Sequence, residues 1–417
     1  MNLATAIFAL TYVLVSLGEN SPRKLDRPTA ALLGAVLMVM TGSLTRAEAT
    51  AALDFSTLAV LFGMMVLLTV LMQSGLPTWL ALKALSRCHS PHALLALVVF
   101  SSGLASAVML NDTVCLLGTP LLLEITTQAR IPAVPFLLAL ATSSNIGSAM
   151  TLTGNPQNII IGHASGWDWS AFALRMAPIV ALCLTVNWLM LEALYRRSLA
   201  SMDGQWNGQW RQSASHSVAV DHTLAFKSVC VFTGLILAFL VGAPMDLAAV
   251  TAATALLVWA NRAPRAALEA VDWSLLLFFA GLFVVVAGFV KADHYLLERW
   301  IGALGTEVTL ASVVQVSLAT LVGSNLFSNV PFVLIMSHWV KQMSHPQFIW
   351  MLLALTSTFA GNLTLFGSVA NVIVAQGAQP KVSLRFSDFL RAGAPITLVT
   401  TAVGALLLWV FWKWGWL

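Results

Sequence analysis

The chain has 417 residues, of which 59% are hydrophobic and 9% are charged, and its formal net charge is +4. Soluble domains carry about 25% charged residues, so a chain this poor in charge cannot cover itself with a water-exposed surface. The composition excludes a soluble globular domain, and the small positive charge does not indicate nucleic-acid binding. No phosphate-binding loop of the form G-x-x-x-x-G-K-[ST] is present, which argues against ATP-driven transport by this chain.

Apolar segments near the ~20 residues needed to cross a bilayer recur along the whole chain. In the first half, the predicted spans are 3–18, 29–45, 55–73, 134–165 and 172–195. In the second half, they are 226–243, 246–261, 273–290, 349–377 and 390–412. We therefore predict an all-α integral membrane protein with about 10 transmembrane helices, in contact with membrane lipid along its length.

Each half contains a further pair of apolar arms between its third and fourth spans. The arms are 93–110 with 114–128, and 308–327 with 330–343. The tips between them are very short and polar: Asn111-Asp112-Thr113 in the first pair and Ser328-Asn329-Val330-Pro331 in the second. Two apolar arms with a minimal polar tip predict a re-entrant hairpin, which is tolerated only where protein or a cavity surrounds the tip. This reading pairs Asp112 with Asn329.

The two halves of the chain repeat one another. The segment "LDFSTLAVLFGMMVLL" from Leu53 matches "VDWSLLLFFAGLFVVV" from Val271, and polar residues stay in register farther along. Ser144 meets Ser357, Thr151 meets Thr364, Gly154 meets Gly367 and Asn158 meets Asn371. Several blocks in the same order predict an internal duplication. The predicted parts are a first repeat (1–197), a cytoplasmic linker (198–225) and a second repeat (226–417).

The distribution of basic residues predicts the orientation. If the N-terminus lies outside, 15 of the 21 Lys and Arg residues fall in inside loops. The positive-inside rule therefore favours N- and C-termini on the outside of a bacterial-type inner membrane. Because five crossings per repeat is an odd number, the second repeat is inverted relative to the first. The first hairpin then enters from the cytoplasm and the second from the outside.

Polar breaks interrupt the fourth span of each repeat. The first is Gly154-Asn155-Pro156-Gln157-Asn158, and the second, at the matching place, is Gly367-Ser368-Val369-Ala370-Asn371. The break persists in the second repeat without a proline, so a simple proline kink does not explain it. Paired interruptions at corresponding repeat positions are the best sequence indication of a transporter binding site.

A broken helix presents free amides and a positive end to an anion, and free carbonyls to Na+. We expect two related cation or coupling sites with the substrate between them, each made by a tip and a break. Asp112 is the most informative residue, because a carboxylate in lipid is expensive and indicates Na+ binding or proton transfer. Asn145 and Asn362 are expected to line the path. No Lys or Arg lies at the predicted midplane, which leaves dipoles, amides and bound cations to hold an anion.

The motifs "TLTGNPQNIIIG" (151–162), "GNLTLFGSVANVIVAQ" (361–376), "NDT" (111–113) and "SNVP" (328–331) resemble those of the ion transporter superfamily. That group contains arsenite-efflux permeases, NhaD-type sodium/proton antiporters, the melanosomal P protein, and citrate and divalent-anion/sodium symporters. The resemblance covers essentially the whole chain. It implies a secondary transporter with an elevator-like or rocking movement, and it is compatible with a homodimer.

The resemblance also implies the site residues. Carried over, they are Asn111, Asp112, Thr113, Gly154, Asn155, Asn158, Ser328, Asn329, Gly367, Ser368 and Asn371. The implied Na+ ligands are Asn111, Asp112 and Gly154 in one site, and Ser328, Asn329 and Gly367 in the other. The dicarboxylate symporters typically carry Ser-Asn-Thr at both tips, and this chain departs from that pattern.

The resulting functional hypothesis is movement of a small anion or oxyanion-like solute, arsenite-like in the first place, coupled to Na+ or H+ and without any other cofactor. An ionised Asp112 would repel a dicarboxylate, so di- or tricarboxylate/sodium symport ranks lower. Na+/H+ exchange without an anion and a channel remain alternatives. An enzyme is disfavoured, because no His, Asp, Glu and Cys cluster has catalytic or metal-ligand spacing.

Overall fold

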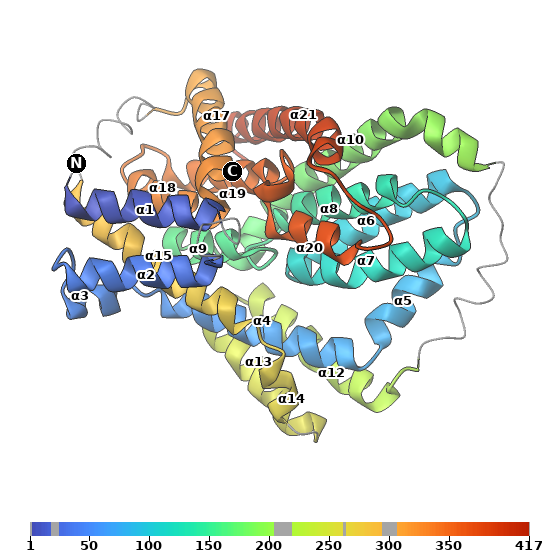
Figure 1. Ribbon diagram of the computed structural model, residues 1–417, viewed down its shortest axis with the longest axis horizontal. Coiled ribbons are helices and arrows are strands. Elements are labelled where there is room, and N and C mark those ends of the chain that lie inside the picture. Colours follow the sequence, from blue (N-terminus) through green and yellow to red (C-terminus); the bar gives the residue numbers. More distant parts are fainter. Residues whose placement is uncertain (1, 18–24, 204–218, 262–263, 294–306, 417) are drawn as a thin grey trace.

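The structure is a computed structural model that describes residues 2–17, 25–203, 219–261, 264–293 and 307–416. Within these ranges the regular elements are all helices (Figure 1). The first half contains α1 (Leu3–Leu17), α2 (Arg27–Met40), α3 (Arg46–Ala51), α4 (Phe55–Gln73), α5 (Leu76–Leu85), α6 (Pro91–Val108), α7 (Asn111–Gln128), α8 (Val134–Ser148), α9 (Pro156–Ser165) and α10 (Trp169–Asp203). The second half contains α12 (His222–Leu240), α13 (Met245–Ala260), α14 (Pro264–Glu269), α15 (Trp273–Ala292), α17 (Leu310–Phe327), α18 (Asn329–Val340), α19 (Pro346–Ala360), η2 (Leu365–Gly367), α20 (Val369–Gly377) and α21 (Phe386–Lys413).

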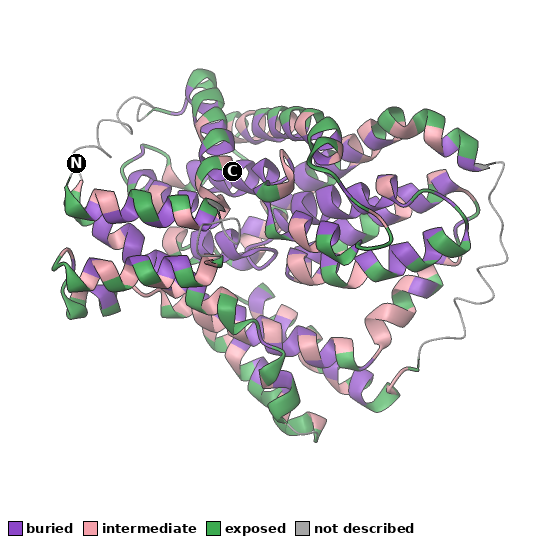
Figure 2. Cartoon of the chain, in the orientation of Figure 1, coloured by how far each residue is buried: buried purple, intermediate pink, exposed green. Residues whose placement is uncertain are grey.

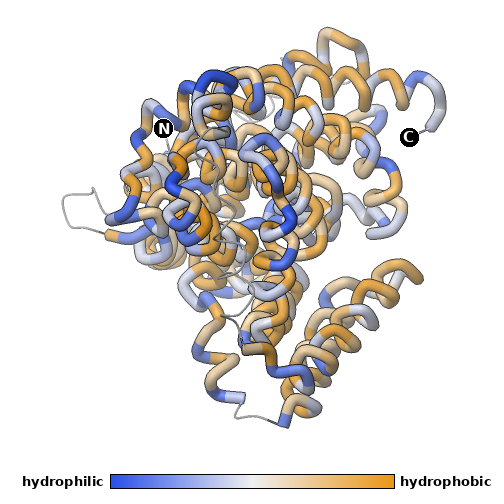
Figure 3. Tube along the Cα trace, turned by 90° about the vertical axis from the view of Figure 1, so that its right-hand side faces the viewer, coloured by the Kyte–Doolittle hydropathy of each residue, from blue (hydrophilic) through white to orange (hydrophobic). Residues whose placement is uncertain are grey.

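Many of these helices are apolar enough for a bilayer. Seven described helices have the length and composition to cross a membrane, namely α4, α6, α10, α12, α15, α17 and α21. Shorter apolar helices of 10–17 residues accompany them, namely α1, α2, α13, α18 and α19. Along the chain, hydrophobic residues dominate the helices, and hydrophilic residues gather at helix ends and connections (Figure 3). The protein is therefore an all-α, multi-pass membrane protein, as predicted.

The duplication is visible in how the helices pack. Helix α2 of the first repeat lies against α15 of the second, and α13 of the second lies against α4 of the first. Glycines make both contacts close. A Cβ added to Gly63 would come within 2.6 Å of the Ala249 backbone, and one added to Gly281 within 2.8 Å of the Ala31 backbone. The interval from Gly63 to Gly281 equals that from Ala31 to Ala249, so the two contacts are related by the repeat.

Matching caps start the matching helices. Asp54 precedes α4 and accepts a hydrogen bond from the Thr57 amide, and Asp272 precedes α15 and accepts one from the Leu275 amide. A side-chain oxygen at this position satisfies one of the backbone donors that a helix start leaves free. The two repeats therefore begin their third span with the same device.

Each repeat contains the predicted hairpin and the predicted broken helix. Helices α6 and α7 form the first hairpin, and α17 and α18 form the second. The fourth spans are divided into α8 and α9, and into α19 and α20. The breaks lie where the two repeats meet, since α9 contacts α18 and α19, and α20 contacts α7 and α8. Figure 2 shows α8 and α9 as largely buried in the middle of the molecule.

The hairpin tips correct one prediction. Helix α7 begins at Asn111 and α18 begins at Asn329, so these two asparagines are the equivalent residues, and Asp112 corresponds to Val330. The interval from Asn111 to Asn329 is also the one that relates Asp54 to Asp272. The prediction had matched the middle residues of the two polar tips, Asp112 and Asn329; the register changes only after the tips, where α18 has 12 residues and α7 has 18.

The predicted linker is shorter than expected at both described ends. Helix α10 continues to Asp203, and α12 begins at His222, where Asp221 caps it through the Leu224 amide. Residues 204–218 of the predicted linker lie outside the described residues, as do Arg23, Lys24, Arg211 and Arg262 of the predicted inside loops.

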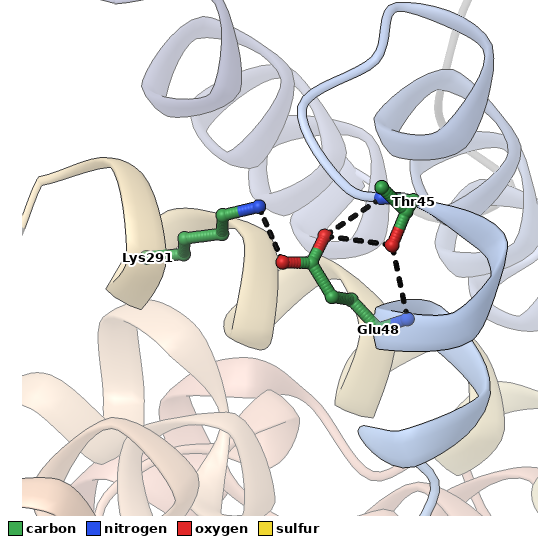
Figure 4. Close-up of polar contacts among 3 residues, drawn as sticks. All are labelled: Thr45, Glu48 and Lys291. Carbon is green, nitrogen blue, oxygen red and sulfur yellow. Dashed lines mark hydrogen bonds and ion pairs between the residues drawn. The ribbon is translucent and has the colours of Figure 1, made fainter.

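A further contact joins the short helix α3 of the first repeat to the end of α15 in the second. Thr45 and Glu48 form a reciprocal capping box at the start of α3. The Glu48 carboxylate also accepts a hydrogen bond from the Lys291 ammonium at 2.6 Å, near the end of α15 (Figure 4). The Lys291 and Thr45 contacts lower the pKa of Glu48 to about 2, with the Lys291 hydrogen bond as the largest cause.

Candidate site at the two hairpin tips and helix breaks

An asparagine clamp holds the first break. Helix α8 ends at Ser148, and α9 begins at Pro156, after Asn155 has capped it through the Asn158 amide at 2.9 Å. The Asn158 side chain donates from Nδ2 to two backbone carbonyls of the break, those of Ser148 at 3.3 Å and Thr151 at 2.9 Å. Carbonyls that a broken helix would leave unpaired in the interior therefore receive partners.

The second break has the same clamp. Asn371 donates from Nδ2 to the carbonyls of Gly361 at 2.8 Å and Thr364 at 2.9 Å. In both clamps the accepting carbonyls lie ten and seven residues before the asparagine. The repeat therefore preserves the hydrogen bonds of the break as well as its sequence.

The residues that cap the two short helices reach across to the other repeat. Asn155 donates from Nδ2 to the Thr358 hydroxyl of α19 at 3.2 Å. Ser368 donates its hydroxyl to Oδ1 of Asn145 in α8 at 3.0 Å. Asn155 and Ser368 are equivalent in the repeat register, and so are Asn145 and Thr358. Each break is thus fastened to the first half of the opposite broken helix.

The break glycines allow the chain to fold closely on itself. A Cβ at Gly154 would come within 2.2 Å of the Ser148 carbonyl oxygen, and one at Gly367 within 2.8 Å of the Gly361 carbonyl oxygen. A distance under 3.0 Å to backbone atoms requires the backbone to shift. Both glycines that the sequence selected therefore serve close backbone approach at the breaks.

The first tip docks directly on the first break. The Asn111 amide donates to the Gly154 carbonyl at 3.1 Å, and its side chain donates from Nδ2 to Asn145 Oδ1 at 3.0 Å. Its own Oδ1 atom is buried and has no hydrogen-bond partner in the described part of the chain. A buried polar atom without a partner is uncommon, and in native proteins it often marks an absent ion or water.

The second tip repeats this feature. Oδ1 of Asn329 is likewise buried without a hydrogen-bond partner among the described residues. The side-chain nitrogen Nδ2 of Asn329 lies 3.4 Å from where a Cβ of Gly361 would stand, so this tip is beside the second break. Two repeat-related tips thus each present one free amide oxygen to the interior.

Asp112 and Thr113 follow Asn111 in the first turn of α7 and are half-buried. Ser328 precedes α18 without capping it through its side chain, and its backbone has φ +71°. The predicted site residues therefore gather at the tips and breaks. A carboxylate follows the tip asparagine only in the first hairpin, because Val330 stands in the place of Asp112 in the second.

Sequence reasoning missed two participants. Thr358 receives the Asn155 side chain, and Asn325 of α17 donates to the Ala360 carbonyl at 3.0 Å while accepting from Thr364 at 3.3 Å. An asparagine near the end of an otherwise apolar arm was the available signal for Asn325. Thr358 gave no such signal, because threonine is common in membrane helices.

The interior is polar without being charged. In the described part of the chain, the fully buried polar side chains are all Ser, Thr, Asn or Gln. The described residues also contain no group of three or more His, Cys, Asp or Glu side chains that could hold a metal ion. Apart from the half-buried Asp112 carboxylate, the site thus offers amides, hydroxyls and helix ends to a ligand.

A family profile described as "Citrate transporter" matches residues 12–360. The chain belongs to the citrate transporter family. It is 33% identical over 448 residues to the silicon efflux transporter LSI3 of Oryza sativa subsp. japonica, covering 92% of each chain. It is 30% identical over 427 residues to a 46 kDa membrane protein of Mycobacterium leprae (strain TN), covering 98% of each chain.

This family member also shares its fold with a solved transporter. The crystal structure of the Alcanivorax borkumensis YdaH transporter matches with a TM-score of 0.54 and 16% identity, over 99% of this chain and 97% of that one. At that identity the likeness concerns the fold alone. The family and its relatives confirm the resemblance to the ion transporter superfamily: the chain is a multi-pass membrane transporter of the anion class, and not an enzyme.

Proposed function

We propose that this transporter moves a small inorganic oxyanion or weak oxyacid, arsenite-like in size and chemistry, coupled to Na+ or H+ bound at the two hairpin tips. The observation that carries the proposal is the pair of buried, unpartnered Oδ1 atoms on Asn111 and Asn329. Both belong to tips related by the repeat, and both lie beside a helix break. A hard cation takes oxygen ligands, and amide and backbone carbonyl oxygens are the ones that these sites hold.

The two cation sites are unequal. In the first, Oδ1 of Asn158 is also buried and has no hydrogen-bond partner among the described residues, and Asp112 adds a carboxylate nearby in sequence. In the second, the corresponding oxygen of Asn371 already accepts a hydrogen bond from Asn145 at 3.1 Å, and Val330 replaces the carboxylate. The first site therefore has more free oxygen ligands and the only negative charge, and we assign it the tighter cation or the proton.

The charges available at the tips and breaks indicate which class of substrate the site accepts. The N-terminal ends of α9 and α20 supply only partial positive charge, and no buried Lys or Arg is present among the described residues. A weak oxyacid needs hydrogen bonds and little charge compensation. A dicarboxylate or citrate would need two or three bound cations and would meet Asp112. The rice relative named as a silicon efflux transporter is in keeping with a small inorganic solute.

The test is flux through the purified protein in liposomes. Arsenite, silicic acid, succinate and citrate are offered in turn under a Na+ gradient and under a pH gradient. We expect gradient-dependent, saturable flux of the oxyacids, lost in Asn111→Ala and in Asp112→Asn. Asn187→Ala is the matched control, because Asn187 is also fully buried and its Oδ1 likewise has no partner among the described residues, but its Nδ2 donates to Thr142 and Ser143 and to no residue of a tip or a break. Coupled uptake of citrate or succinate without oxyacid flux would overturn the substrate assignment, and gradient-independent flux would indicate a channel.

One observation favours Na+/H+ exchange as a second candidate. In residues 110–113, 149–158, 328–331 and 361–371, Asp112 is the only residue with an acidic or basic side chain. A single carboxylate that alternates between a proton and Na+ is sufficient for exchange. A Na+ jump that drives proton flux without any anion, and that Asp112→Asn abolishes, would favour this candidate over the first.

A further inference from the structure

Asn145 stands at the centre of the polar interior, in α8, with 2% of its surface exposed. All four hydrogen-bonding positions of its amide are in use. Oδ1 accepts from Asn111 Nδ2 at 3.0 Å and from the Ser368 hydroxyl at 3.0 Å. Nδ2 donates to Asn362 Oδ1 at 2.9 Å and to Asn371 Oδ1 at 3.1 Å. The amide therefore cannot rotate without losing several bonds.

These partners come from different sites. Asn111 belongs to the first tip, whereas Ser368 and Asn371 belong to the second break. The equivalent residue of the second repeat does not make such a bridge. Thr358 accepts from Asn155 at 3.2 Å and from Gln157 at 3.4 Å, and both donors belong to the first break. The Asn145 amide thus connects the first tip to the second break, and the equivalent Thr358 does not connect the second tip to the first break.

We propose that Asn145 couples the two cation sites, so that occupancy of one sets the affinity of the other; this rests on the two sites of the proposed function. A cation on Asn111 Oδ1 withdraws electrons from that amide and makes its N–H groups stronger donors to Asn145. Hydrogen bonds in series polarise one another, so Asn145 in turn donates more strongly to Asn371. Asn371 clamps the carbonyls of the second break and thereby transmits the change.

The coupling also runs backwards, because thermodynamic linkage is reciprocal. A cation at the second site that orders the Asn371 clamp orders Asn145, and Asn145 then fixes the Asn111 side chain with its Oδ1 facing the first site. Asn145 itself needs no contact with an ion, and it acts as a positioning residue for both sites.

The informative variant is Asn145→Thr, which installs the residue that the second repeat carries at this position. A hydroxyl is shorter than an amide and has one donor, so it cannot bridge Asn111, Ser368, Asn362 and Asn371 together. Thr358→Val is the matched control, since it removes a buried acceptor of the same network that serves the first break alone.

The measurement is a titration of the purified full-length protein with NaCl at constant ionic strength, read as the melting temperature and as the initial rate of flux in liposomes. The same titration is made with protons in the absence of Na+. We expect a Hill coefficient clearly above 1 and at most 2 for the unaltered chain, falling to about 1 in Asn145→Thr. Thr358→Val is expected to weaken cation affinity and to keep the unaltered Hill coefficient.

A second measurement covers the case in which Asn145→Thr does not fold. Asn111 and Ser368 do not bond each other, so a double-mutant cycle of Asn111→Ala and Ser368→Ala reports coupling through Asn145. We expect about fivefold or greater non-additivity in cation affinity. Additive variants, or a Hill coefficient of 1 in the unaltered chain, would overturn the coupling and leave the two sites in place. A chain that responds to neither Na+ nor protons would instead overturn the proposed function.

Discussion

The two helix breaks share one construction, and they keep the same glycine and the same clamping asparagine while the three residues between these differ. Asn158 and Asn371 donate to carbonyls at the same two distances along the chain, and the capping side chains of Asn155 and Ser368 each cross to the other repeat. Pro156 has no counterpart. The comparison teaches that the break depends on the asparagine that satisfies its carbonyls, and that the proline is an addition to one copy.

The hairpin tips differ more. The first places Asp112 next to its free amide oxygen, and Leu110 before its helix has ordinary extended dihedral angles. The second has Val330 instead, and Ser328 before its helix has φ +71° and ψ 157°. Only glycine adopts that combination without strain. One site has therefore gained charge, and the other holds backbone strain.

The largest expected effect comes from removing a clamp. Asn158→Ala and Asn371→Ala each leave two buried carbonyls without their donor, at about 1–3 kcal/mol per group. We expect each variant to lose on the order of 2–4 kcal/mol of stability and at least tenfold in transport rate. Asn371→Ala is expected to be the worse of the two, because it also removes an acceptor from Asn145. Thermal melting in detergent and flux in liposomes measure the two effects.

The control for both clamps is Asn187→Ala. Asn187 donates to the hydroxyls of Thr142 at 3.2 Å and Ser143 at 2.8 Å, and hydroxyls can turn to other acceptors. Its loss should leave transport within about threefold. If Asn187→Ala is as damaging as the clamp variants, the breaks owe nothing special to Asn158 and Asn371.

The second prediction concerns the strained tip. Ser328→Gly relieves a backbone conformation that costs on the order of 1–3 kcal/mol, and it loses part of this gain to the greater chain entropy of glycine. We expect a net stabilisation of about 1 kcal/mol, seen as a higher melting temperature. Ser328→Ala separates strain from the hydroxyl, because alanine keeps the strain and removes only a hydroxyl that makes no cap. Equal melting temperatures for the two variants would show that the strain carries no cost.

Pro156→Ala tests the comparison of the breaks directly. Pro156 occupies the first helical position of α9, where a missing N–H costs little and the fixed φ suits the helix. Its replacement should therefore cost no more than about 1 kcal/mol, the range in which proline restricts the unfolded chain. Transport should stay within about twofold of the unaltered protein. A loss of transport in Pro156→Ala would mean that the first break depends on its proline, unlike the second break, which has none.

The sequence alone predicted the positions of the breaks and hairpins, because polar residues inside apolar membrane segments are costly and mark interruptions of the helix. The pairing of Asn158 with Asn371 followed from the repeat register and proved correct in the clamps. The pairing of Asp112 with Asn329 was wrong, because it matched the middle residues of the two polar tips instead of the first residues of the helices that follow them. A one-residue error of this kind is invisible where both tips are short and polar.

Contacts between the repeats were beyond the sequence. That Asn155 reaches Thr358, and Ser368 reaches Asn145, depends on how α8 and α19 lie against each other. The helical pattern shows which residues are apolar, but it does not show which face meets the other repeat when both faces are buried. The central position of Asn145 therefore became visible only in three dimensions.

The smallest expected effect on stability concerns two surface ion pairs, one in each of the short helices α3 and α14. Glu48 of α3 reaches across to Lys291 of the other repeat at 2.6 Å, whereas Glu269 of α14 pairs at 2.7 Å with Arg265 in its own helix. Only the first pair joins the repeats, so only its loss should loosen their contact. Glu48→Gln is expected to lower the melting temperature slightly, and Glu269→Gln to leave it unchanged.

The difference in melting temperature between the unaltered chain and Glu48→Gln is expected to depend on pH. The pKa of Glu48 falls from 4.5 to about 2 on folding, chiefly through the hydrogen bond from Lys291. A carboxyl whose pKa is depressed on folding adds its stability above the unfolded value, and that stability is lost as the pH falls through the folded value. The melting temperature of the unaltered chain should therefore approach that of Glu48→Gln between about pH 4.5 and pH 2, and high salt should reduce the difference at neutral pH. A difference between the two proteins that stays constant down to pH 2 would show that the negative charge of Glu48 does not cause it.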